Sequence, residues 1–275
     1  MSDENLYTVI PPKTIMEMTF EEVEQLRQKT DVAIVGVAAI EEHGYHLPLG
    51  MDAFFCTEIM KNAYRTLEAE GLYALLGPTI EFGVCPGAMG YAGSISMRPD
   101  TTKAIIVDVC ESLYTHGFKK IVLVMGHDEN LPAMAMAAQI LTQAHDDLEV
   151  LSLNILFPMK AAEGPLLKSK KRDGHAGAGE TGRLMATHPN LVYVERTQPD
   201  PDIDAPFPRD IPGGGPPLIG GGVYNPAREL RLYDRSRHPG QTGDPRDANV
   251  EIGQAGLKGM GDWIADVIKR DFMGL

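Results

Sequence analysis

The stretch DVAIVGVAAIEEHGYHLPLGMD, residues 31–52, joins an apolar run to a cluster of carboxylates and imidazoles. The run at 31–37 has the length of one β-strand, and its continuous apolar character is typical of a strand buried on both faces of a parallel sheet. The charged cluster begins where this strand ends. The stretch therefore indicates both the class of fold and the place of a functional site.

The same pairing of a buried strand with polar residues recurs at KKIVLVMGHDEN, residues 119–130. Around these strands, helical periodicity alternates with short apolar runs. Helices are predicted at about 20–28, 53–70, 101–117, 131–145, 180–188 and 249–271, and strands at 31–37, 72–80, 119–126 and 148–156. This alternation requires crossover connections, so we predict an α/β fold, a three-layer α/β/α sandwich with a mostly parallel sheet. In such sheets the ligand crevice lies beyond the carboxyl ends of the strands.

Composition limits the classes of partner. The chain has 275 residues, 43% of them hydrophobic, and a formal net charge of -13, which opposes binding to nucleic acids or anionic membranes. Its longest basic cluster is KSKKR at 168–172, and its three cysteines lack CxxC spacing. No leader segment or membrane-length apolar run is visible. We therefore expect a cytoplasmic protein with a small-molecule substrate and no thiolate metal site.

One long segment interrupts the alternation of helices and strands. Residues 199–246 include PDPDIDAPFPRDIPGGGPPLIGGG, which is too rich in proline and glycine for a lasting helix or strand. Only about 30 residues follow it, too few for an independent domain. We predict a single domain over residues 1–275 that carries this segment as a long functional loop.

Two pairs of metal-binding residues follow the two buried strands. If the chain beyond the first strand stays extended, Glu41 and His43 project to one side, while Glu42 faces away, toward solvent or behind the ligands. The same parity pairs His127 with Glu129. Imidazole and carboxylate ligands without thiolate suit zinc, manganese or iron.

Asp52 supplies a fifth donor that could bridge two ions. Two divalent ions balance three carboxylates better than one ion does, and leave charge to activate a water molecule. Taken singly, these residues have simpler readings: Asp52 as a helix N-cap, and His43 or His127 as a hydrogen-bonded loop residue. His46 could instead fix the loop that carries His43.

These motifs resemble those of the creatininase family. EEHGYHLPLGMD is similar to the family signature E-x-H-G-x-H-L-P-x-x-x-D, and MGHDEN is similar to its G-H-x-x-N motif. Three later segments resemble family elements in the same order: YAGSISM (91–97), GHAGAGET (174–181) and GDPRDANVEIGQAGL (243–257). The resemblance implies one α/β/α domain, two divalent metal ions per subunit and a homo-oligomer, commonly hexameric.

The resemblance also assigns metal ligands. It implies that Glu41 and His127 bind one ion, that His43 and Glu129 bind the other, and that Asp52 bridges them. Zinc and manganese are the metals expected, with iron as a further option. The hydroxide formed between the ions would attack a carbonyl of the substrate.

The resemblance further implies catalytic and substrate-binding residues. His175 would pass a proton to the departing group, and Glu180 would orient His175 or hold the start of its helix. Asp128 and Ser94 are the expected substrate-binding residues.

Three departures from creatinine-hydrolysing members argue against creatinine as the substrate. Those members place tryptophans over the substrate, whereas the only tryptophan here is Trp263, in the predicted final helix. Gly174 replaces an acidic residue, and Asp128 replaces a tyrosine. We expect a hydrolase of another small ring or amide. One alternative is a ring-opening C–C hydrolase of a cyclic polyol diketone, similar to 3-dehydro-scyllo-inosose hydrolase. A second is a noncatalytic, metal-stabilised binding protein.

Overall fold

A parallel sheet of four strands, in the order β2-β1-β3-β4, lies at the centre of the computed structural model. The structure describes residues 8–167, 173–201 and 238–275. The strands are β1 (Val32–Val37), β2 (Leu75–Ile80), β3 (Lys120–Met125) and β4 (Glu149–Leu153). Strands β1 and β3 pair without a shift along all six residues of each. Every residue of β1 is buried, which confirms that this strand is covered on both faces.

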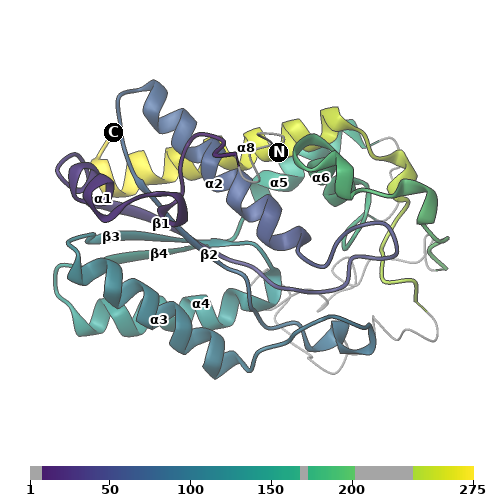
Figure 1. Cartoon of the computed structure of the whole chain (residues 1–275), viewed down its shortest axis with the longest axis horizontal. Coiled ribbons are helices and arrows are strands. Elements are labelled where there is room, and N and C mark those ends of the chain that lie inside the picture. Colours follow the sequence, from purple (N-terminus) through teal and green to yellow (C-terminus); the bar gives the residue numbers. More distant parts are fainter. Residues whose placement is uncertain (1–7, 168–172, 202–237) are drawn as a thin grey trace, which may run out of the picture.

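Helices cover both faces of the sheet, as Figure 1 shows. One layer contains α1 (Phe20–Arg27), α2 (Met51–Ala69), α5 (Leu156–Glu163), α6 (Ala178–Thr187) and α8 (Val250–Ile268). The other layer contains α3 (Pro99–Thr115) and α4 (Leu131–Ala144), which pack against each other. The predicted three-layer α/β/α arrangement is confirmed. Because β1 and β3 are the central strands, their carboxyl ends lie next to each other.

Local sequence signals account for some helix boundaries. Thr19 and Glu22 form a reciprocal capping box at the start of α1. Gly117, at φ +91°, follows the end of α3 and turns the chain toward β3. Two strand boundaries were wrong by three residues: the strand predicted at 72–80 begins at Leu75, and the strand predicted at 148–156 ends at Leu153. The Asn154 side chain accepts the N–H of Leu156, and the apolar residues that follow start helix α5, which the sequence pattern did not predict.

Helices α6 and α8 touch backbone to backbone. A Cβ atom added to Gly253 of α8 would lie 1.9 Å from the carbonyl oxygen of Gly182 of α6. Only glycine permits this approach. The contact fixes α6, which carries part of the functional site, against a helix that packs on α2 and α5.

The two ends of the predicted long loop are held together. Gln241 Nε2 donates to the carbonyl oxygen of Gln198 at 2.7 Å, and Asp200 accepts the N–H of Gly243 at 2.8 Å. The rest of the loop, residues 202–237, and the basic cluster at 168–172 lie outside the described residues. The single-domain assignment therefore stays a prediction. None of the described helices is long and apolar enough to cross a membrane.

Candidate metal centre

Four of the predicted ligands meet beyond the carboxyl ends of β1 and β3. Glu41 and His43 follow β1, His127 follows β3, and Asp52 lies in the first turn of α2. Nδ1 of His127 is 3.4 Å from Glu41 Oε1 and 3.3 Å from Asp52 Oδ2. Nε2 of His43 is 3.3 Å from Asp52 Oδ1. All four side chains are largely buried.

The donor atoms form two groups that share Asp52. Glu41, Asp52 and His127 have donor atoms within 4.8 Å of one another, as do His43, Asp52 and Glu180. A third group joins Glu41 and His43 with a further histidine, His175, within the same distance. A carboxylate that belongs to two three-residue groups has the position of a bridging ligand.

The hydrogen bonding of these residues fits bound cations. His43 Nε2 and Asp52 Oδ2 are buried, yet neither has a hydrogen-bond partner within the described residues. Buried polar atoms are nearly always paired, because an unpaired one costs about 1–3 kcal/mol. The donor set of imidazoles and carboxylates, turned toward one another at 3.3–3.6 Å, is suited to divalent metals such as zinc and manganese.

The charges in the cluster perturb one another strongly. Burial raises the pKa of Glu41 to about 7, although His127 and His175 oppose the shift. Burial also disfavours ionisation of Asp52, but His43 and His127 outweigh it and hold the pKa of that carboxyl well below its usual range. Burial lowers the pKa of His127, but Glu41 and Asp52 outweigh this effect and raise it well above the usual value. Such strongly perturbed groups in one place are typical of a functional site.

His175 lies between two carboxylates. Its Nε2 donates to the carbonyl oxygen of Glu42 at 2.7 Å and lies 3.3 Å from a carboxylate oxygen of the same residue. Its Nδ1 is 3.3 Å from Glu41 Oε1. Although burial acts in the opposite direction, Glu41 and Glu42 raise the pKa of His175 well above its usual value. The ring is therefore suited to hold a proton at the edge of the metal cluster.

Glu42 is not at the surface, where one interpretation of the sequence put it. It is 3% exposed, and its carboxylate accepts the N–H of Gly44 at 2.9 Å. Gly44 has φ +65°, so the chain turns there and the alternation of an extended strand does not continue. The carboxylate lies against His175, behind the ligands, which is the other position that the sequence allowed.

Glu180 and Glu129 occupy different sides of the cluster. A carboxylate oxygen of Glu180 lies 3.6 Å from His43 Nε2 and accepts the N–H of Ala176 at 2.6 Å. Glu129 lies 3.5 Å from Nε2 of His127, on the side of the ring away from Nδ1, the atom that faces Asp52. The structure thus brings Glu180 next to His43, where the sequence had suggested Glu129.

The two predicted substrate-binding residues also differ in position. Asp128 follows His127 directly, in the short 3-10 helix Asp128–Asn130 beyond β3. Ser94 is 8% exposed, and its hydroxyl accepts the N–H of Glu42 at 3.0 Å. Ser94 therefore supports the loop that carries Glu41 and His43. Its contact with a substrate stays a prediction.

Asn130 is a structural member of the site whose role was not predicted. It is fully buried, and its Nδ2 donates to the carbonyl oxygens of Ala38 at 2.9 Å and Val37 at 3.3 Å. Its Oδ1 accepts the N–H of Val84 at 2.8 Å. One side chain thus ties the chain after β3 to the segments that follow β1 and β2. The asparagine of the G-H-x-x-N motif was the available signal.

His46 is also completely buried. Its Nε2 lies 2.9 Å from the hydroxyl oxygen of Thr181 in α6, and its carbonyl oxygen accepts the N–H of Tyr193. Burial lowers the pKa of His46 to about 4, so the ring is neutral near pH 7. These contacts agree with the interpretation that this ring fixes the loop of His43.

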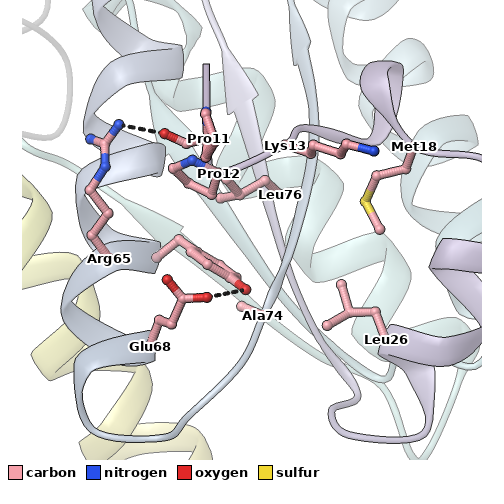
Figure 2. Close-up of a pocket in the computed structure, with 10 residues that line it drawn as sticks. Pro11, Pro12, Lys13, Met18, Leu26, Arg65, Glu68, Ala74 and Leu76 are labelled. Carbon is pink, nitrogen blue, oxygen red and sulfur yellow. Dashed lines mark hydrogen bonds between the residues drawn. The ribbon is translucent and has the colours of Figure 1, made fainter. Parts of the chain in front are cut away.

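A separate pocket of about 360 Å³ lies near the amino end of β2, where the chain passes between α1 and α2 (Figure 2). Pro12, Lys13 and Leu76 line it, and Arg65 and Glu68 project from α2. Its lining has one carboxylate and no histidine. This pocket lacks the imidazole and carboxylate donors of the cluster described above. It also lies at the amino end of the sheet strands, whereas the cluster lies at their carboxyl ends, so we do not assign metal binding to the pocket.

Comparisons with known proteins agree with this geometry. The sequence profile of the creatininase (creatinine amidohydrolase) family matches residues 16–268. Creatinine amidohydrolase of Pseudomonas putida is 26% identical over 274 residues, which cover 93% of this chain and 96% of that protein. Mycofactocin precursor peptide peptidase of Mycobacterium tuberculosis is 27% identical over 177 residues, 62% of this chain and 64% of that protein. The 3-dehydro-scyllo-inosose hydrolase of Thermotoga maritima is 24% identical over 187 residues, 65% and 57% of the two chains.

Solved structures share the fold. A protein of Bacteroides fragilis NCTC 9343 superposes with a TM-score of 0.73 at 25% identity, covering 88% of this chain and 90% of its own. A creatininase variant of Zn–Zn type gives 0.73 at 23% identity, and a manganese creatininase gives 0.72 at 24%, each covering 94% of this chain and 99% of its own. With a family profile that spans nearly the whole chain, these matches show that the protein belongs to the creatininase family of hydrolases.

Proposed function

We propose that this protein is a dinuclear metal-dependent hydrolase that cleaves a bond next to a carbonyl group in a small amide or ring. The observation that carries the proposal is the position of Asp52, whose two oxygens each lie 3.3 Å from a different histidine. One carboxylate can serve two ions in this arrangement. The zinc and manganese forms of related creatininases support divalent metals of this kind.

The proposal has two metal subsites. Glu41, His127 and Asp52 would hold the first ion, and His43, Glu180 and Asp52 the second. For the third donor of the second subsite, the distances favour Glu180 over Glu129, because Glu180 lies beside His43 and Glu129 contacts the far nitrogen of His127. Glu129 would then orient that imidazole, a common role for carboxylates beside metal-binding histidines.

The ions, when bound, would supply an activated water and polarise the carbonyl group of the substrate. His175 would supply the proton for the departing atom. Its Nδ1 faces the cluster, while its Nε2 is held by the carbonyl oxygen of Glu42. The carboxylates of Glu41 and Glu42 favour the protonated ring, which is the form that a general acid requires.

The substrate is proposed to differ from creatinine. Trp263, the only tryptophan in the chain, lies in α8 and packs against the hydrophobic core, so it does not cover a substrate at the strand ends. Asp128, next to His127, provides a polar group instead. A polar site of this kind favours a more oxygenated ring or amide, because a substrate without matching groups would leave polar groups unpaired.

Ring-opening cleavage of a C–C bond is the second candidate reaction. It is supported by the similarity to 3-dehydro-scyllo-inosose hydrolase and by the polar character of Asp128. The same cluster would serve it, since both reactions begin with attack on a carbonyl. They differ in whether His175 protonates nitrogen or carbon.

A panel of substrates tests the proposal. Protein stripped with a chelator would be reloaded with Zn²⁺ or Mn²⁺ and assayed against creatinine, small cyclic and linear amides, short peptides and cyclic polyol diketones. We expect turnover only after reloading, and a large loss of kcat in His175→Gln with unchanged metal content. Turnover by the stripped protein, or full activity of His175→Gln, would contradict the proposal. A hexameric assembly and a cytoplasmic location remain predictions, which size-exclusion chromatography with light scattering and cell fractionation would check.

A further inference from the structure

We propose that the hydrogen bond between His46 and Thr181 is a positioning device that sets the distance between the two halves of the metal cluster. Nε2 of His46 lies 2.9 Å from Oγ1 of Thr181, and both side chains are fully buried. The bond joins the loop after β1 to the first turns of α6. The inference rests on the proposed function, because it assigns the bond an effect on the second metal subsite.

One end of this bond belongs to the loop that carries Glu41 and His43. Gly44 turns this loop at φ +65°, and a Cβ atom there would lie 3.0 Å from Nδ1 of His46. The imidazole of His46 therefore packs directly beneath the turn that follows His43. The carbonyl oxygen of His46 also accepts the N–H of Tyr193, which ties the loop to the chain beyond α6. Movement of this ring would move His43.

The other end belongs to the segment that carries His175 and Glu180. Thr181 follows Glu180 directly, and its N–H donates to the carbonyl oxygen of Gly177 at 2.9 Å. Between His175 and Glu180 lies Ala176, the one residue other than glycine with positive φ, at +50°, in the described part of the chain. Its N–H donates to the carboxylate of Glu180. A strained turn persists only where its surroundings hold it, so this segment behaves as a rigid unit.

The bond consequently joins two rigid units, one with His43 and one with Glu180. Nε2 of His43 and the Glu180 carboxylate lie 3.6 Å apart, and both would have to contact the same ion. Partners of metal ligands that lie behind the ligands typically change metal affinity by about 10- to 100-fold when removed. The first subsite, formed by Glu41, Asp52 and His127, receives no residue from α6 and should be unaffected.

The experiment uses Thr181→Val, which removes the hydroxyl at nearly constant volume, and Thr181→Ser, which keeps it. Thr102→Val is the matched control, because Thr102 is also fully buried but lies in α3 and its hydroxyl has no partner within the described residues. Each full-length protein would be stripped and titrated calorimetrically with Mn²⁺. Glu180→Gln serves as the reference for loss of the second subsite, and a melting curve is recorded for each variant.

We expect Thr181→Val to keep one tight site and to bind the second Mn²⁺ about 10- to 100-fold more weakly, as Glu180→Gln does. Thr181→Ser and Thr102→Val should bind both ions like the unmodified protein. Unchanged binding of two ions by Thr181→Val, equal weakening of both ions, or failure of this variant to fold would overturn the inference. An unmodified protein that binds no Mn²⁺, Zn²⁺ or Fe²⁺ would instead contradict the proposed function itself.

Discussion

Oδ2 of Asp52 lies 3.3 Å from Nδ1 of His127, although one residue lies in the first turn of helix α2 and the other follows strand β3. The second oxygen of the same carboxylate lies 3.3 Å from Nε2 of His43, beyond β1. Two adjacent strands of a parallel sheet and the helix that follows the first of them therefore converge on one side chain. This convergence supports the proposal of two metal ions in a single crevice.

Replacement of Asp52 should remove both ions. In Asp52→Ala the two histidines lose their common partner, so we expect less than one equivalent of metal per chain and no detectable turnover. Metal content measured by mass spectrometry after gel filtration checks this, with circular dichroism to show that the variant is folded. A folded Asp52→Ala protein that retains two equivalents would refute the bridge.

Replacement of Glu180 and replacement of Glu129 should weaken metal binding to different extents. Because Glu180 lies beside His43, Glu180→Gln should lose the second ion and keep the first. Glu129→Gln should retain both ions with about 10-fold weaker binding, since it only loosens the imidazole of His127. Titration of both variants with Mn²⁺ distinguishes the roles. Loss of the second ion in Glu129→Gln alone would restore the ligand set that the sequence suggested.

Asn130→Ala should destabilise the fold. The substitution leaves the N–H of Val84 and the carbonyl oxygen of Ala38 without their partner in a buried region. We expect the free energy of unfolding to fall by about 2–4 kcal/mol. Urea denaturation of the metal-free protein measures it. Asn62→Ala, which removes a donation to the carbonyl oxygen of Glu58 and an acceptance from Arg65 at a half-buried position of α2, is the control and should change this energy by less than about 1 kcal/mol.

The sheet and its ligand edge could be predicted because they depend on local patterns. The buried runs at 31–37 and 119–126 form the central strands, and ligands placed directly after them reach the same edge of the sheet. Family motifs extended this prediction to His175. Helix α5 could not be predicted, because Ile155 and Leu156 continue the apolar run of β4 and only the side chain of Asn154 marks the turn.

The details of the cluster depend on contacts between distant segments. Extended alternation turned Glu42 away from the ligands but left open whether solvent or protein would face its carboxylate; His175 and the chain at Gly240, both distant in sequence, cover it. The family motif gave Glu180 a role in orienting His175 or in holding the start of its helix. Its contact with His43 arises only when α6 docks on α8 through paired glycines. No pattern within one segment contains this information.

Acid should destabilise the metal-free protein partly through His46. Burial lowers its pKa in the folded state to about 4, below the usual 6.5, so between these values the unfolded chain binds more protons. The free energy of unfolding therefore falls as pH decreases from 6.5 toward 4, by on the order of 1 kcal/mol per pH unit from this residue. Urea denaturation of the unmodified protein and His46→Gln at several pH values measures the slope. Equal slopes for the two proteins would contradict the assignment to His46.

Creatinine should be a poor substrate. Because the only tryptophan, Trp263, packs against the core and Asp128 stands beside His127, no tryptophan is available to cover that ring. We expect kcat/KM for creatinine to be at least about 100-fold below that of the best substrate in the panel, and Asp128→Tyr alone not to restore it. Steady-state kinetics with Mn²⁺-loaded protein decide the point. Comparable values for creatinine and the best alternative would make this protein a creatininase in activity as well as in family.

The most direct test of the central claim is a crystal structure of the Mn²⁺-loaded protein with an anomalous difference map. The account predicts two peaks about 3.5–4 Å apart, one on each side of the Asp52 carboxylate, with His127 at one and His43 at the other. A single peak, or two peaks of which neither touches Asp52, would contradict it.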